Sequence, residues 1–176
     1  MRIILFLLDT LFFILVAAAL LRGWMNTRRL RMTQQPGPFV IAVTDWIVQP
    51  LRRTLPRPWA QANTDWGSLL AALLLSLAYA GLVALLGGTG ADYLLGIPLL
   101  ALHFLLRTVL QGLMVLLLVY AVLSWVQPMA PVLGLLGRLL EPLLAPVRRV
   151  IPTVGGVDLS VLVLLIGLQV ALMLLG

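Results

Sequence analysis

The sequence predicts an all-α membrane protein with four transmembrane helices, arranged as two parallel two-helix repeats that each carry a cytoplasmic amphipathic interfacial helix. Of the 176 residues, 62% are apolar and only 10% are charged, whereas soluble domains have roughly a quarter of their residues charged. The mean hydropathy is +1.11. This length leaves room for four spans of about 20 residues and short connections, and a basic motif occurs twice.

The duplication is visible as two basic motifs that lie 96 positions apart. Residues 50–56 read Pro-Leu-Arg-Arg-Thr-Leu-Pro, and residues 146–152 read Pro-Val-Arg-Arg-Val-Ile-Pro. Each copy lies between two long apolar runs, so the chain reads as a repeated unit of span, basic loop and span. We therefore predict a first repeat at residues 1–90 and a second at residues 91–176.

The first repeat opens with an apolar run at residues 3–21, followed by Trp24, an aromatic residue typical of the membrane interface. The next apolar stretch is too short to cross a bilayer. Within 39–53 the polar side chains share one helical face, which predicts an interfacial helix. A second span is expected at 66–86. Its small side chains recur every four residues, a pattern for close packing against another span or for a dimer face: Ala72, Ser76, Ala80 and Ala84.

The second repeat contains a longer apolar run, from Tyr93 to Trp125, in which Arg107 is the only charged residue. Counting back about 20 residues from Trp125 predicts a span at 106–124. The remainder, 93–105, is then an outer interfacial segment, interrupted by glycine and proline. The amphipathic pattern returns at 131–149, where we expect the second interfacial helix, and the fourth span is predicted at 159–175.

Charge predicts the orientation. Ten of the twelve arginines lie in the loops 22–57 and 138–149, and there is no lysine. The positive-inside rule places both loops in the cytoplasm and both termini outside. Because these arginines flank apolar spans, we assign them to anionic head groups and expect no nucleic-acid partner. The absence of cysteine excludes disulfides and thiolate chemistry.

Asp9 is the unusual residue of the first span, since a carboxylate near mid-membrane costs roughly 2.5 to 3.5 kcal/mol. Arg107 lies near the outer end of the third span. From the helical rise, the two residues are expected about 22 Å and about 27 Å above the cytoplasmic interface. We predict a structural intramembrane ion pair between them. Snorkelling to outer water and a proton or ion site are the alternatives.

The two Arg-Arg pairs are the strongest candidates for function. Each basic side chain near an anionic leaflet contributes about 1 kcal/mol, so we predict that they contact lipid or a partner; the alternative is that they only determine topology. The predicted contact residues are Arg52, Arg53, Arg148, Arg149 and Arg138.

The sequence shows no paired acids, no nucleophile with a histidine at matching depth, and no phosphate-binding glycine loop. The single histidine, His103, cannot supply both axial ligands of a b-type haem. We therefore predict no enzyme activity and no cofactor or metal site.

The ordered set of motifs resembles the YggT family of bacterial and plastid membrane proteins. The resemblance rests on a tryptophan that closes each odd-numbered span, on proline-flanked Arg-Arg, and on Gly-Gly-Val-Asp-Leu-Ser at 155–160. It implies membrane homeostasis under osmotic stress, cell-division and chromosome-distribution phenotypes, and in plastids maturation of a b-type cytochrome. It implies no catalytic residue.

From these observations we expect a non-enzymatic scaffold or assembly factor for a membrane complex. Its partners would be anionic lipid and either a larger membrane protein complex or further copies of the chain. The alternative is a small ion or solute transporter or channel subunit, with a polar path along Asp9, Arg107, Gln111 and Gln169.

Overall fold

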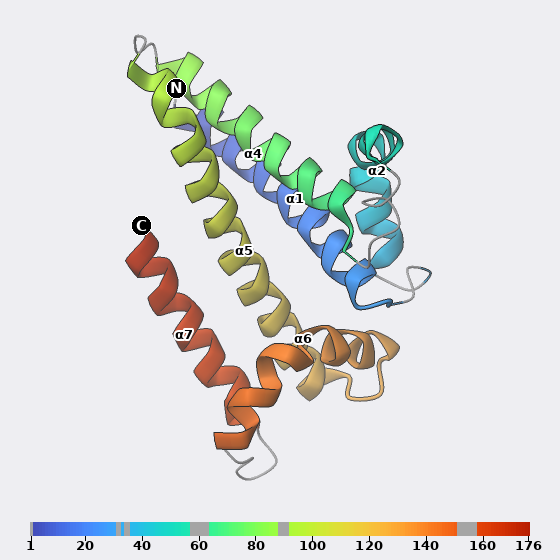
Figure 1. The fold of residues 1–176 in the computed structure, drawn as a ribbon. Coiled ribbons are helices and arrows are strands. Elements are labelled where there is room, and N and C mark those ends of the chain that lie inside the picture. Colours follow the sequence, from blue (N-terminus) through green and yellow to red (C-terminus); the bar gives the residue numbers. More distant parts are fainter. Residues whose placement is uncertain (1, 31–32, 34–35, 57–63, 88–91, 151–157) are drawn as a thin grey trace. The chain divides into compact units, whose positions relative to one another are not determined.

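The computed structural model describes residues 2–30, 33, 36–56, 64–87, 92–150 and 158–176 (Figure 1). These residues form helices joined by short connections, which confirms the predicted all-helical fold. The helices are α1 (Arg2–Thr27), α2 (Gly37–Thr54), α4 (Trp66–Gly87), α5 (Asp92–Val126), α6 (Pro131–Val150) and α7 (Leu159–Leu175).

Three described segments are long and apolar enough to cross a membrane: α1, α4 and the Gly96–Val126 part of α5. The fourth predicted span, α7, is equally apolar but has 17 residues. Because a bilayer core of about 30 Å takes roughly 17 to 25 helical residues, α7 lies at the short end of that range. The chain is therefore a membrane protein with at least three candidate spans among its described residues.

Packing divides the chain into two compact units, residues 1–109 and 110–176, with the boundary inside α5. In the first unit, α1 and α4 run side by side in opposite directions (Figure 1). Their core combines Val16 and Ala19 of α1 with Ala72 and Leu75 of α4, and Phe104 of α5 joins it. Small residues at this interface let the helix backbones approach closely.

Helix α2 packs across the ends of α1 and α4 in the first unit. Its buried residues Val40, Thr44 and Val48 recur every four residues and so form one face. Helix α6 has the corresponding place in the second unit, where Leu140 and Leu144 pack against Leu117 of α5 and Val161 of α7. Both helices contain internal prolines and continue through them.

Two element boundaries differ from the sequence expectation. Helix α1 extends to Thr27, beyond the apolar run that ends at residue 21, because its polar last turns bond to α2. Helix α5 is not interrupted at Pro98 and runs for 35 residues. A membrane helix tolerates an internal proline because neighbouring helices, serine or threonine side chains and small local adjustments satisfy the backbone groups that the proline leaves unbonded. The position of 93–105 relative to the bilayer stays a prediction.

Candidate functional site

The first arginine of each Arg-Arg pair binds the aspartate that begins the next long helix. In the first unit, Arg52 in the last turn of α2 forms an ion pair with Asp65, directly before α4. A second bond joins Arg52 Nε and Asp65 Oδ1 at 3.3 Å. A bidentate arginine–carboxylate contact fixes both side chains in one plane. It therefore holds the end of α2 at the start of α4.

Asp65 is also the N-cap of α4. Its Oδ1 accepts the backbone N–H of Ser68 at 3.2 Å, and its Oδ2 accepts the Ser68 hydroxyl at 2.8 Å. Burial would raise the pKa of Asp65, but hydrogen bonds from Arg52 and Ser68 and the charge of Arg52 lower it below its usual value. The carboxylate therefore stays ionised and serves two helices at once.

Gly67 makes room for this contact. A Cβ atom on Gly67 would lie 2.6 Å from Cγ of Arg52, closer than two carbon atoms can pack. The arginine stem therefore crosses the first turn of α4 where that turn has no side chain. This explains the Asp-Trp-Gly-Ser sequence of the first repeat at 65–68.

A second contact joins α1 to α2. Arg22 of α1 is buried, and its guanidinium donates to the Thr44 hydroxyl at 3.0 Å and to Asp45 Oδ1 at 3.0 Å. Gln49 donates to the other oxygen of Asp45. A buried arginine is stable only when its charge is paired and hydrogen-bonded, as it is here. Helix α2 is therefore tied to α1 by Arg22 and to α4 by Arg52.

In the second unit, Arg148 alone contacts both the following helix and the preceding helix, as Arg52 and Arg22 do separately in the first unit. Its Nε and Nη2 bond to Asp158 Oδ2 at 2.9 Å and 2.6 Å. Nη2 also donates to the Tyr120 hydroxyl of α5 at 3.4 Å, and Nη1 lies 3.5 Å from Glu141 Oε2. Arg148 therefore joins α6 to α7 and α5.

Asp158, like Asp65, is an N-cap, because it accepts the backbone N–H of Ser160 at 3.1 Å. Burial would raise the pKa of Asp158, but the hydrogen bonds from Arg148 and Ser160 lower it below its usual value. Burial would lower the pKa of Arg148, and its bonds to Asp158 and Tyr120 raise it instead. Both ions therefore stay charged. We call Arg52–Asp65 and Arg148–Asp158 the two struts.

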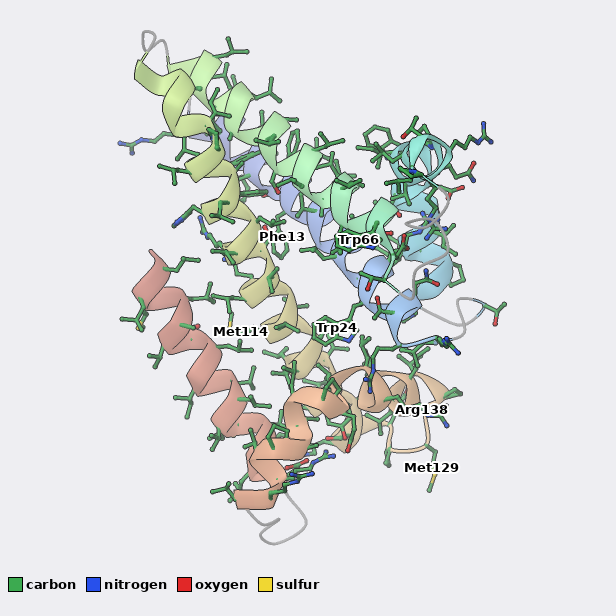
Figure 2. The ribbon with its side chains drawn as sticks, in the orientation of Figure 1. Phe13, Trp24, Trp66, Met114, Met129 and Arg138 are labelled. Carbon is green, nitrogen blue, oxygen red and sulfur yellow. The ribbon has the colours of Figure 1, made fainter. Side chains whose placement is uncertain are left out.

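The second arginine of each pair is placed differently. Arg53 and Arg149 are exposed, as is Arg138 of α6 (Figure 2). None of the three takes part in the ion pairs of the described residues, which involve only Arg22, Arg52 and Arg148. The predicted contact residues thus fall into two groups. Arg52 and Arg148 form ion pairs within the protein, although the Arg52 side chain is 41% exposed and that of Arg148 is 34% exposed. Arg53, Arg138 and Arg149 are exposed and lie outside these ion pairs. Contact with lipid or a partner stays a prediction for all five.

Asp9 has a partner that sequence reasoning did not identify. Its Oδ1 accepts the hydroxyl of Tyr79 on α4 at 2.9 Å. The Tyr79 ring stacks on Phe104 of α5, with 3.9 Å between ring centroids. Arg107 lies within electrostatic reach of the same tyrosine. Among the described residues Asp9 makes no ion pair with Arg107; that pairing stays a prediction.

Of the predicted small-residue ridge, Ala72, Ser76 and Ala80 are buried in α4. Ala84 is half-buried. In the candidate polar path, Gln111 is half-buried and Gln169 is exposed. The described residues contain no group of three or more histidine, aspartate or glutamate side chains that could hold a metal ion.

Sequence reasoning also missed Asp65 and Asp158 as arginine partners. The signal was present, since each aspartate directly precedes a long apolar run that follows an Arg-Arg pair. Two other acids, Asp45 and Glu141, lie closer to the arginines in the sequence and share a helical face with them. Of these, Glu141 does contact Arg148, whereas Asp45 binds Arg22 from another helix.

Comparison with known proteins gives one consistent result. The family described as CCB3/YggT matches residues 1–86 and 99–176. The chain is 36% identical to "Uncharacterized protein in proC 3'region" of Vibrio alginolyticus, over 97% of this chain and 92% of the relative. It is also 36% identical to "Uncharacterized protein YggT" of Escherichia coli K12, over 97% and 87%. No solved structure matches the chain. The chain therefore belongs to the CCB3/YggT family, as the motifs predicted.

Proposed function

We propose that this protein is a non-enzymatic scaffold or assembly factor of the bacterial inner membrane. It would cross the membrane four times as two parallel repeats, with both termini outside. In this arrangement α2 and α6 are amphipathic helices that lie in the cytoplasmic interface and contact anionic lipid or a larger membrane partner. Osmotic homeostasis, which the family resemblance implies, would be one process that such a scaffold serves.

The repeated strut is the observation that carries the proposal. Arg52 and Arg148 each tie the last turn of an amphipathic helix, α2 or α6, to the aspartate that directly precedes an apolar helix, α4 or α7. A short helix fixed in this way lies beside the membrane end of the spans, where a basic surface meets head groups. For α7, 17 residues give about 26 Å of helix, which crosses a bilayer core with little tilt.

The chemistry available also favours a scaffold. The ion pairs of the described residues that join different helices connect Arg22 with Asp45, Arg52 with Asp65, and Arg148 with Asp158. Such contacts rigidify a surface. A rigid basic surface of fixed depth suits the alignment of lipid or of a partner's acidic groups.

The test is isolation of the protein from its native membrane in a mild detergent, followed by identification of what co-purifies. The proposal expects a membrane protein, or further copies of this chain, in stoichiometric amount. Reconstituted protein should carry no ion flux. A monomer that co-purifies with nothing would contradict the scaffold.

One observation favours the alternative, a small ion or solute transporter or channel subunit. Asp9 and Tyr79 place a hydrogen-bonded carboxylate inside the apolar part of α1 and α4, and intramembrane acids often serve ion or proton pathways. If reconstituted protein carries a flux that Gln111→Leu with Gln169→Leu abolishes, transport replaces the scaffold. A flux that depends on Asp9→Asn would have the same consequence.

A further inference from the structure

We propose that the two arginines of each pair have separate tasks: the first is the internal strut, and the second binds the head group of an anionic phospholipid. The lipid-binding residues are then Arg53 on α2 and Arg149 on α6, with Arg138 beside Arg149. The inference deepens the proposed function and rests on its interfacial placement of α2 and α6. It narrows the contact surface from five arginines to three.

The charges on this side of the protein leave these arginines without an internal counterion. From residue 22 to residue 65 the only acids are Asp45 and Asp65, and from residue 126 to residue 158 the only acids are Glu141 and Asp158. All four are engaged by Arg22, Arg52 and Arg148 in the structure. Arg53, Arg138 and Arg149 must therefore find anions outside the chain, or only water.

The struts fix the depth of the second arginine. Asp65 and Asp158 each directly precede an apolar helix, so their partners Arg52 and Arg148 lie level with the end of a span. Arg53 and Arg149 follow one residue later, about 1.5 Å along the helix axis and turned by about 100°. An arginine at that level lies where lipid phosphates lie, and its planar fork suits a phosphate group.

The exposed face of α2 favours lipid over a soluble acidic partner. Phe39, Trp46 and Arg53 are spaced by seven residues, so they share one face, and Phe39 and Trp46 are 54% and 62% exposed. Large apolar rings in line with an arginine are typical of helices that lie at the head-group and acyl-chain boundary. The rings would enter the acyl region while the arginine meets the phosphate.

The exposed face of α6 carries two arginines. Arg138 and Arg149 are 11 residues apart, which is three helical turns or about 16 Å, so both lie on one face. Val150, next to Arg149, is 81% exposed. Glu141 is also exposed on α6, but it lies 3.5 Å from Arg148 and so leaves the outer arginines unpaired. This face can bind one head group at each end.

The test measures lipid binding to the purified full-length protein in a mild detergent by native mass spectrometry. The probe is phosphatidylglycerol, and zwitterionic phosphatidylcholine is the reference lipid. Wild-type protein should prefer phosphatidylglycerol, and added salt should weaken that preference. In the double variant Arg53→Gln with Arg149→Gln, affinity for phosphatidylglycerol should fall by about fivefold for each arginine removed. Binding of phosphatidylcholine and the melting temperature should not change.

The matched control is Arg52→Gln with Arg148→Gln, which removes the same charge from the adjacent positions. It should lower the melting temperature while the folded fraction keeps its preference for phosphatidylglycerol. Should the control fail to fold, Arg53→Lys with Arg149→Lys decides, because it keeps the charge and should keep most of the binding. A lysine variant as weak as the glutamine variant would overturn the proposal.

Two other results would also overturn it. One is an unchanged, wild-type affinity for phosphatidylglycerol in the Arg53→Gln, Arg149→Gln protein. If that protein also loses a membrane protein that co-purifies with the wild type from cells, these arginines bind a protein surface instead. The other is a folded strut variant that loses as much lipid binding as the outer variant. Because the lipid-binding assay contains no partner protein, a negative result contradicts the lipid contact but not the scaffold. The scaffold is tested separately by co-purification.

Discussion

At the residue scale, the equivalent arginines Arg52 and Arg148 both bind an aspartate but differ in their other contacts. Arg52 and Arg148 each bind an aspartate N-cap, with the partner 13 or 10 residues further along the chain. Among the described residues of the second unit, no arginine of α5 pairs with α6 as Arg22 of α1 pairs with α2; Arg148 instead contacts the preceding helix through Tyr120. The strut is therefore what the two repeats share, whereas the link to the preceding helix is built differently in each.

Gly67 provides a test of the first strut. Replacement of a helical glycine by alanine normally stabilises by roughly 0.5 to 1 kcal/mol. In Gly67→Ala the new methyl would meet Cγ of Arg52 at 2.6 Å, so the strut must move and the protein should lose stability. Gly81→Ala in the same helix is the control, since nothing lies within 4 Å of its Cβ position. When thermal unfolding is measured in detergent, Gly67→Ala should have a lower melting temperature than wild type, and Gly81→Ala should not.

The struts also predict a dependence on acid. The pKa of Asp65 in the folded protein lies below its usual 3.8, so the unfolded chain takes up a proton first. The stabilisation is complete above about pH 5 and is lost as the pH falls below 3.8 through the folded value. The difference in melting temperature between wild type and Asp65→Asn should therefore become smaller as the pH is lowered from about 5 to below 3.8. A difference that stays constant down to strong acid would show that the charge of Asp65 does not contribute.

The depth of a polar residue along its span was predictable from the sequence, but the group that it contacts was not. The cost of burying Asp9 correctly indicated that it needs a polar neighbour. The ion pair with Arg107 stays a prediction, whereas the hydrogen bond between the Tyr79 hydroxyl and Asp9 was not predicted from the sequence. Depth along a helix follows from counting, whereas rotation about the helix axis depends on tertiary packing. The sequence alone gives no such rotation for α1 against α4.

At the element scale, helices were predictable wherever apolar runs or amphipathic periodicity delimit them. Helix α7 at 159–175 and helix α6 at 131–150 agree with the sequence expectation to within a residue. Helix α5 did not follow it, because a proline was given more weight than the cooperativity of a 35-residue helix. The end of α1 was also missed, since a tertiary contact of Arg22 extends it.

The contact between Asp9 and Tyr79 couples α1 to α4 and can be measured. Polar contacts between membrane helices contribute about 0.6 kcal/mol on average and about 1.7 at most. Tyr79→Phe and Asp9→Asn should each destabilise the protein, and the double variant should lose less than the sum. The same cycle with Arg107→Gln in place of Tyr79→Phe tests the predicted ion pair. Additive losses in the tyrosine cycle would contradict the contact.

At the scale of the whole molecule, duplication and charge lead to one arrangement. Ten arginines lie in two loops, and the Arg-Arg pairs within these loops are 96 residues apart in equivalent positions. If an even number of spans separates these loops, both face the same side and the outer arginines of α2 and α6 act on one leaflet. The proposed lipid contacts and the proposed scaffold depend on this sidedness, whereas the struts do not. It is the central claim of the account.

Cysteine labelling tests that claim most directly, because the chain has no cysteine of its own. Thr54 and Val150 occupy equivalent repeat positions, are exposed, and end α2 and α6. In intact cells, Thr54→Cys and Val150→Cys should both resist a membrane-impermeant maleimide and react after permeabilisation, whereas Thr89→Cys should react at once. Reaction of only one of the two equivalent positions in intact cells would place the repeats on opposite sides and contradict the parallel arrangement.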